Sequence, residues 1–215
     1  MDNFTLINGS IIDHYVGIIR DKNSCKSTFS NAIENIMYLM IPDITSGFAS
    51  SPKKVLTPMA EAVAASFSER VLIIPILRAG LAMLEPLKKV IPNTTFGYIG
   101  MKRKTDEVTG EIRADMYYCN LPSGLAGCKV LMLEVVIATG SSLIPAIEHL
   151  ISNGAKQEDI SVVSIISARP GLEVLHKAFP DIRLFACAVD DALDENGYII
   201  PGLGDAGDRY NGYVH

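Results

Sequence analysis

Four largely apolar runs constrain the fold of this 215-residue chain more than any other feature. They cover residues 71–77, 129–133, 161–166 and 184–189. A strand that is apolar on both faces is typical of a parallel sheet covered by helices on both sides. Residues 143–151 form an amphipathic helical pattern that stops before Gly154, and Pro170 opens a second such pattern. Alternating strands and helices predict an α/β domain.

The pattern before the first apolar run is mixed. Apolar residues over 29–40 recur at spacings of three and four, which predicts one face of a helix. Residues 41–58 contain three prolines and Gly47, so we expect loop and short extended pieces there. Residues 13–26 are polar and favour no element clearly.

Composition and charge narrow the class of protein. With 48% hydrophobic and 20% charged residues, the chain fits one globular domain spanning 1–215. A net charge of −5 disfavours nucleic-acid binding, which needs a basic footprint. There is neither an N-terminal targeting pattern nor a run of 18 apolar residues, so we expect a soluble cytoplasmic protein without a membrane partner. The four cysteines match no zinc pattern, and we expect buried free thiols: Cys25, Cys119, Cys128 and Cys187.

A charged, two-armed segment over residues 97–120 interrupts the strand and helix alternation. It carries lysines, arginines and acids around a Thr109-Gly110 turn, which predicts a solvent-facing hairpin. Such a hairpin can act as a flap that closes over a site and excludes water. A hairpin with no part in any site fits this segment equally well.

The loop after the second apolar run carries the strongest chemical signal. Glu134 ends a buried strand, and a helix begins at Ser141 and Ser142. Carboxyl ends of parallel strands line the ligand crevice, and loop amides at a helix N-terminus attract phosphate. The hydroxyls of Thr139 and of both serines add donors, while Glu134 is placed to accept from sugar hydroxyls. Neither a P-loop nor a G-x-G-x-x-G pattern is present, and an ordinary helix cap remains the alternative.

The C-terminal segment 197–209 contains four glycines and the two aspartates Asp205 and Asp208. Glycines let the backbone turn sharply and approach a ligand closely. The segment therefore predicts a binding surface, with a flexible solvated tail as the alternative.

Three separated motifs, and a further short piece in the charged segment, resemble sequences of known protein families. The stretch from Glu134 to Ser142 resembles the phosphoribosyl-pyrophosphate (PRPP) motif of type I phosphoribosyltransferases. Residues 75–81 and 198–208 resemble the uracil phosphoribosyltransferase family in particular, and residues 100–103 match that family's flap. The family loop reads Asp-Pro-Met-Leu-Ala-Thr-Gly-Gly-Ser, so Glu134, Val135, Val136 and Ser141 are departures. The resemblance is weaker before Val71.

The resemblance implies a fold and a set of roles. The fold is a parallel sheet flanked by helices, with a flap at about 97–120 and a small hood from the N- and C-terminal segments. Arg78 and Arg103 would hold pyrophosphate, and Asp205 would face PRPP through a metal-bound water; these three are the implied catalytic residues. The implied PRPP-binding set is Arg78, Arg103, Glu134, Val135, Val136, Ile137, Ala138, Thr139, Gly140, Ser141, Ser142 and Asp205. The implied uracil-binding set is Ile199, Gly204, Asp205 and Ala206. Residues 197–209 are called the base-binding loop below because of this implied role.

The resemblance also implies an activity. The chain would transfer the phosphoribosyl group of PRPP to uracil, giving UMP and pyrophosphate, with Mg²⁺ bound through PRPP and water. Its partners would be PRPP, uracil and further copies of the chain in a dimer or larger oligomer, with GTP left open as an effector. Two alternatives remain: a transferase for another base, and a catalytically silent regulatory protein that binds PRPP or a nucleotide.

Overall fold

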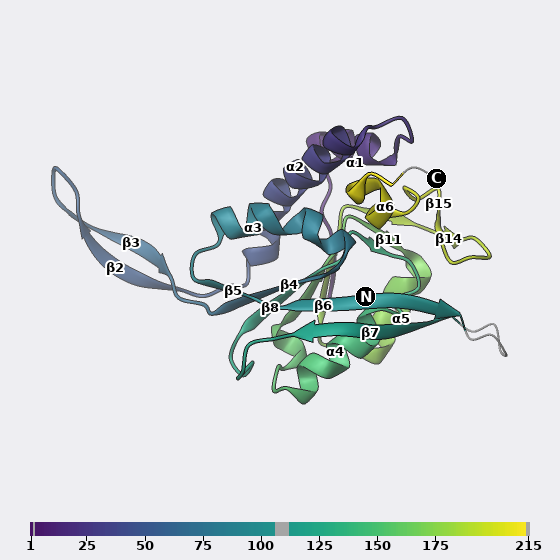
Figure 1. Ribbon diagram of the computed structural model, residues 1–215. Coiled ribbons are helices and arrows are strands. Elements are labelled where there is room, and N and C mark those ends of the chain that lie inside the picture. Colours follow the sequence, from purple (N-terminus) through teal and green to yellow (C-terminus); the bar gives the residue numbers. More distant parts are fainter. Residues whose placement is uncertain (2, 106–111, 214–215) are drawn as a thin grey trace.

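The computed structural model of the protein describes residues 1, 3–105 and 112–213, without the side chains of residues 103–105 and 112–113. Its centre is an eight-stranded sheet in the order β1-β12-β10-β8-β4-β6-β7, with β5 beside β4 (Figure 1). The strands are β1 Phe4–Leu6, β4 Val71–Leu77, β5 Thr94–Phe96, β6 Tyr98–Thr105, β7 Ile112–Asn120, β8 Lys129–Leu133, β10 Ile160–Val163 and β12 Arg183–Ala186. All pairs are parallel except β6 with β7. The predicted α/β fold is confirmed.

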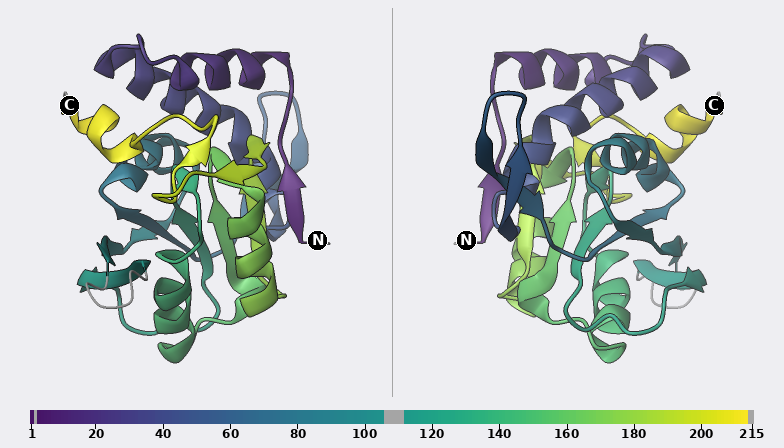
Figure 2. Two further views of the ribbon diagram at one scale, coloured as in Figure 1. Left: turned by 90° about the vertical axis from the view of Figure 1, so that its right-hand side faces the viewer. Right: turned by 90° about the vertical axis from the view of Figure 1, so that its left-hand side faces the viewer.

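Helices cover both faces of the sheet (Figure 2). One face carries α1 Ser10–Arg20, α2 Lys26–Thr45, α3 Leu84–Val90 and the 3₁₀ helix η1 Ala79–Met83; the other carries α4 Leu143–Ser152 and α5 Arg169–Ala178. A short 3₁₀ helix, η2 Gln157–Asp159, precedes β10.

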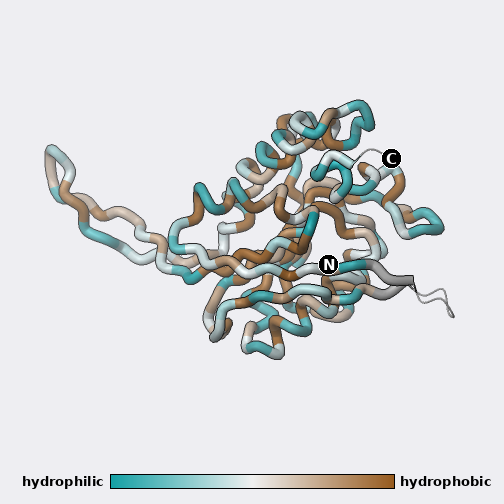
Figure 3. The backbone as a smooth tube through the Cα atoms, viewed as in Figure 1, coloured by the Kyte–Doolittle hydropathy of each residue, from teal (hydrophilic) through white to brown (hydrophobic). Residues whose placement is uncertain are grey.

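Successive residues of β4 show why the strand is apolar throughout. Val71 and Ile73 join the core cluster that contains α1 and α2, whereas Leu72 and Ile74 join the cluster that contains α4 and α5. Side chains alternate across a strand, so burial on both faces requires apolar residues at every position. The brown segments in the middle of Figure 3 follow this sheet.

Two of the expected strands are each divided in two. The run 161–166 forms the end of β10 and the start of β11 Ile166–Ala168, and the run 184–189 is split between β12 and β13 Ala188–Asp190. The carbonyl of Val135 accepts from both Ile165 and Ile166, and the carbonyl of Ile165 accepts from both Cys187 and Ala188. Such sharing is typical of β-bulges, which bend strands. The bend starts a second parallel sheet, β13-β11-β9, with β9 at Val136–Ile137.

The N-terminal expectations need one correction. Residues 41–58 are not mainly loop: α2 continues past Pro42 to Thr45, and β2 Ser50–Leu56 pairs with β3 Glu61–Phe67 in a hairpin that projects from the body (Figure 1). The helix persists because Ile41 and Ile44 extend the buried face that begins with Phe29. Helix α1 covers residues 10–20 and so includes the first part of the segment 13–26, which the sequence left unclear.

The predicted two-armed hairpin is present as β6 and β7, paired from Tyr98 with Asn120 to Thr105 with Ile112. The expected Thr109-Gly110 turn lies outside the described residues. The C-terminal segment forms β14 Ala192–Leu193, β15 Ile199–Ile200 and α6 Ala206–Asn211. Helix α6 packs against α2, so the two ends of the chain together form the implied hood (Figure 1).

Two further expectations are resolved by burial. Cys128 and Cys187 are buried as predicted, but Cys25 and Cys119 are exposed, because they lie at the start of α2 and on the open arm β7. All four thiols are free.

No helix in the described part of the chain combines the length and apolar character that a membrane crossing requires.

Candidate active site

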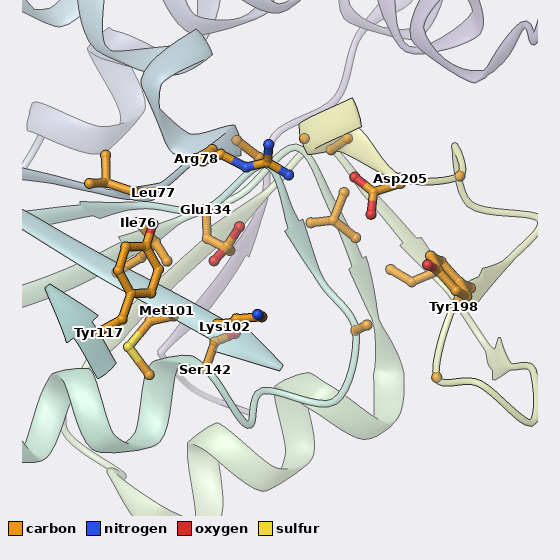
Figure 4. Close-up of a pocket in the computed structure, with 18 residues that line it drawn as sticks. Ile76, Leu77, Arg78, Met101, Lys102, Tyr117, Glu134, Ser142, Tyr198 and Asp205 are labelled. Carbon is orange, nitrogen blue, oxygen red and sulfur yellow. The ribbon is translucent and has the colours of Figure 1, made fainter. Parts of the chain in front are cut away.

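The carboxyl ends of β4 and β8 open onto a cavity of about 570 Å³ (Figure 4). Its lining comes from four parts of the chain: the end of β4, the hairpin β6–β7, the loop after β8 and the base-binding loop. The lining residues are Ile76, Leu77, Arg78, Ala79, Met101, Lys102, Tyr117, Glu134, Val136, Ala138, Ser142, Gly197, Tyr198, Ile199, Gly204, Asp205, Ala206 and Gly207. The structure therefore brings together the loop after β8 and the base-binding loop, which lie far apart in sequence.

Arg78 and Glu134 each directly follow one of two neighbouring strands, β4 and β8. Pro75 of β4 pairs with Leu133 of β8, so the residues that follow both strands emerge side by side. The side chain of Arg78 is half exposed, and its Nη2 lies 3.4 Å from Oδ1 of Asp208. An ion pair this exposed contributes little to stability. The contact keeps the guanidinium beside the cavity, and breaking it to reach a ligand would cost little free energy.

The loop after β8 divides its residues between the cavity and the core. Ala138 and Ser142 line the cavity together with Glu134 and Val136, while Val135 and Ile137 are buried. The hydroxyls of Thr139 and Ser141 lie 2.8 Å apart and bond to each other, and neither side chain belongs to the cavity lining. The expected row of three hydroxyls is therefore reduced at the cavity to Ser142.

Gly140 explains how the loop accepts a serine where the family pattern has a second glycine. Gly140 has φ of +76°, a conformation that favours glycine, whereas Ser141 keeps a φ outside the left-handed region. The amide of Ser141 donates to Oγ1 of Thr139, and the carbonyl of Gly140 accepts from Leu143 as α4 begins. Serine is thus compatible with the helix start, and the left-handed turn falls one residue earlier.

The base-binding loop lines the cavity with small residues such as Gly204 and Ala206 and with the side chains of Tyr198 and Asp205 (Figure 4). Ile199 is 7% exposed because its side chain packs in the core, and Gly204 carries no side chain. Asp205 caps α6 by accepting from the amide of Asp208 at 2.8 Å. Ile199, Gly204 and Ala206 therefore line the same cavity as Arg78 and Glu134.

Some lining residues were not identified from the sequence. Met101 and Tyr117 come from opposite arms of the β6–β7 hairpin, where the antiparallel pairing brings both arms to one wall. Tyr198 lies in the base-binding loop and Lys102 in the flap motif, so both had a sequence signal but no assigned role. The side chain of Arg103 lies outside the described residues.

Comparison with known proteins agrees with this geometry. The family model described as "Uracil phosphoribosyltransferase" matches residues 6–212. A uracil phosphoribosyltransferase of Campylobacter fetus subsp. fetus is 37% identical over 209 residues, covering 97% of both chains. The solved structure of the AQ2163 protein from Aquifex aeolicus superposes with a TM-score of 0.88 at 28% identity, covering 98% of this chain and 99% of that one.

A more distant likeness supports the fold alone. A hypoxanthine phosphoribosyltransferase from Staphylococcus aureus gives a TM-score of 0.50 at 13% identity, over 76% of each chain. With the family model matching nearly the whole length, the chain belongs to the uracil phosphoribosyltransferase family.

Proposed function

We propose that this protein transfers the phosphoribosyl group of PRPP to uracil, producing UMP and pyrophosphate. One observation carries the proposal: the loop after β8 and the base-binding loop line one cavity, beside Arg78. A sugar phosphate on the first loop and a pyrimidine on the second would meet in that space. The family membership supports the same reaction.

PRPP would bind along the ends of β4 and β8. The amides of the loop 138–142 and the start of α4 would hold its 5′-phosphate, since a helix N-terminus and loop amides favour anions. Glu134 would accept hydrogen bonds from the ribose hydroxyls. Arg78 and Arg103 would bind pyrophosphate, because a guanidinium gives bidentate contacts to phosphate oxygens.

Mg²⁺ would reach the site bound to PRPP. Within the described residues, histidines, cysteines and acids form no cluster of three that could hold a metal ion by themselves. Glu134 and Asp205 nevertheless supply carboxylate oxygens at the cavity, which suit Mg²⁺ and its bound waters. When bound, the ion would neutralise charge on the leaving pyrophosphate.

Uracil would be recognised by the main chain at Ile199, Gly204 and Ala206, with Asp205 between the base and PRPP. Its O2, N3–H and O4 edge reads acceptor, donor, acceptor, and backbone N–H and C=O groups can match that order. Cytosine presents an amino donor where uracil has an acceptor, which would leave polar groups of the site unpaired.

The reaction needs little covalent chemistry from the protein. N1 of uracil bonds to ribose C1 and loses its proton, while the bond from C1 to pyrophosphate breaks and the leaving group takes the electron pair. The chain would orient both substrates and stabilise the negative charge of pyrophosphate through Arg78 and Arg103. We assign no residue as general base.

An assay with labelled uracil tests the proposal directly. Purified protein with Mg²⁺ and PRPP should convert uracil to UMP and release one pyrophosphate per UMP, with cytosine as the negative control. Saturable UMP binding without turnover would instead support a silent regulatory protein. Turnover with another base in place of uracil would support the same reaction on a different substrate.

The family assignment leads us to further proposals about partners and location. The protein would work in the cytoplasm as a dimer or larger oligomer. The β2–β3 hairpin supports an oligomer, because Leu56, Met59 and Val63 are 86%, 93% and 72% exposed on an arm that projects from the body (Figure 1). Light scattering after size-exclusion chromatography would measure the oligomeric state, and adding GTP to the assay would test it as an effector.

A further inference from the structure

Both backbone groups of Gly202 are held by one buried ion pair. Asp190 ends β13, and Oδ2 accepts from the amide of Gly202 at 3.0 Å. Nη1 of Arg20 donates to the carbonyl of Gly202 at 2.8 Å and to Asp190 Oδ2 at 2.8 Å, and Nη2 donates to Oδ1 at 2.7 Å. The pair therefore bonds bidentately within itself and grips the base-binding loop on both sides of one residue.

The ion pair of Arg20 and Asp190 is called the clamp below, and it is largely shielded from solvent. The side chains of Asp190 and Arg20 are 8% and 24% exposed. Burial by itself would raise the pKa of Asp190, but the hydrogen bonds from Arg20 and from the Gly202 amide, together with the charge of Arg20, bring that pKa below its ordinary value. Asp190 is thus ionised at neutral pH, and removing either partner would leave a buried charge uncompensated.

Gly202 has a backbone conformation that residues with a side chain rarely adopt. Gly202 is buried, has φ of +54°, and a Cβ on it would lie 2.2 Å from the carbonyl oxygen of Ile199. The loop thus turns back tightly on itself at this residue. A small change in the backbone angles of Gly202 would therefore move the residues that follow it.

A second arginine holds the neighbouring residue. Nη1 of Arg209 donates to the carbonyl of Leu203 at 2.9 Å and to the carbonyl of Ile19. Nη2 of Arg209 donates to the backbone carbonyl of Asp21 at 2.7 Å. Its guanidinium lies 4.3 Å from the ring centroid of Phe29. The end of α1 therefore anchors the loop at Gly202 and at Leu203, directly before the residues that line the candidate active site.

Gly204 depends on these anchors. It lines the active-site cavity and also a second cavity of about 400 Å³ on the side of Arg20 and Arg209. A Cβ built on Gly204 would meet nothing within 4 Å, so the space beside this residue is open. The hydrogen bonds at Gly202 and Leu203 hold the chain directly before it.

We propose that Arg20 and Asp190 are positioning residues that set uracil affinity by fixing the main chain of the base-binding loop. The inference rests on the proposed function and adds to it two residues that do not line the active-site cavity. Neither residue lines that cavity, and their contact with the loop is at Gly202, between Ile199 and Gly204 of the implied base site. We therefore expect the larger effect on the base half of the site. Polar groups that read an edge of a base must be held within a fraction of an ångström.

Steady-state kinetics separate the two halves of the site. We expect Asp190→Asn and the milder Arg20→Lys to raise the KM for uracil about 10-fold or more, while the KM for PRPP changes by less than about threefold. The matched control is Asp191→Asn, since Asp191 is the next residue and pairs with Arg169 at 2.9 Å on the exposed surface. Equal effects on both KM values, or an equal effect of the control, would overturn the proposal.

Binding without turnover gives a second, independent measurement. Calorimetric titration should show that both clamp variants bind UMP about 10-fold more weakly than the unmodified protein, yet bind ribose 5-phosphate unchanged, because that ligand lacks the base. Equal weakening for both ligands would indicate general damage and reject the clamp. Failure of the unmodified protein to make UMP would reject the proposed function instead, and UMP binding would still test the clamp.

Discussion

Arg78 and Glu134 line one cavity because each directly follows one of two paired parallel strands, β4 and β8, whose carboxyl ends open at the same edge of the sheet. One side chain is cationic and the other anionic, and the base-binding loop faces both (Figure 4). The cationic side chain suits an anionic group such as pyrophosphate, and the carboxylate suits the hydroxyls of a sugar, in agreement with the proposed binding of PRPP.

Replacing Arg78 by alanine should reduce kcat/KM by about 10²–10³-fold, the typical effect of losing one donor to a developing anion. The melting temperature should hardly change, because the side chain is 52% exposed. Arg169→Ala is the control, since Arg169 is 56% exposed and does not line the cavity. Unchanged kinetics in Arg78→Ala would remove Arg78 from the pyrophosphate site.

Glu134 should tolerate shortening better than loss of charge. Glu134→Gln should raise the KM for PRPP about 10-fold, since hydrogen bonds to charged groups are worth about 1.5–3 kcal/mol. Glu134→Asp restores the acid of the family pattern and should keep more of the affinity. If Glu134→Asp were the weaker enzyme of the two, the carboxylate would not be the group that binds the ribose.

Substitution of Gly140 should affect the free energy of unfolding more than substitution of Ser141. Gly140→Ala should destabilise the protein by about 1–2 kcal/mol, because alanine resists a positive φ and its Cβ would lie 3.1 Å from the carbonyl oxygen of Gly171. Ser141→Gly should change stability by less than about 1 kcal/mol, since it loses only the hydroxyl bond to Thr139. Urea unfolding of both variants measures the contrast.

Asp190 should make the free energy of unfolding depend on pH in the acid range. Its folded-state pKa lies below the ordinary value of 3.8, so its contribution is complete above the unfolded-state pKa and is lost as the pH falls through the folded-state pKa. Asp190→Asn should cost about 3 kcal/mol at pH 7, as expected when one partner of a buried ion pair is removed. The difference between the two proteins should shrink when urea unfolding is repeated below pH 4. A difference that stays constant with pH would contradict this assignment.

Cys25 should be the most reactive thiol. The hydrogen bond from Ser27, followed by that from Thr28, lowers its pKa to about 6, so the exposed thiol is largely thiolate at pH 7. Burial raises the pKa of Cys119, and it raises that of Cys187 to about 12. Mass spectrometry after brief iodoacetamide treatment should find Cys25 alkylated first and more slowly at pH 5, with Cys25→Ser as the control. Preferential labelling of Cys119 would show that these hydroxyls do not activate Cys25.

The sequence predicted the helices and strands whose burial leaves a regular pattern of apolar residues along the chain. The apolar run of β4 and the amphipathic face of α4 were located from the sequence, because burial on two faces and on one face leave different periodicities. The bulges at Ile165 and Cys187 left no such trace, since the residues on both sides of each bend are equally apolar. Pro42 suggested a break in α2, but the burial of Ile41 and Ile44 outweighed it.

For the candidate site, the sequence determined the chemical character and the tertiary structure decided the partners. Strand ends followed by Arg78 and Glu134, and a glycine-rich loop around Asp205, can be read from the chain because each depends on a few adjacent residues. Arg20 looks in sequence like any charged residue at the end of a helix. Only the folded chain brings it to Asp190 and Gly202, because contacts between distant segments depend on how the sheets and helices pack, which local sequence does not encode.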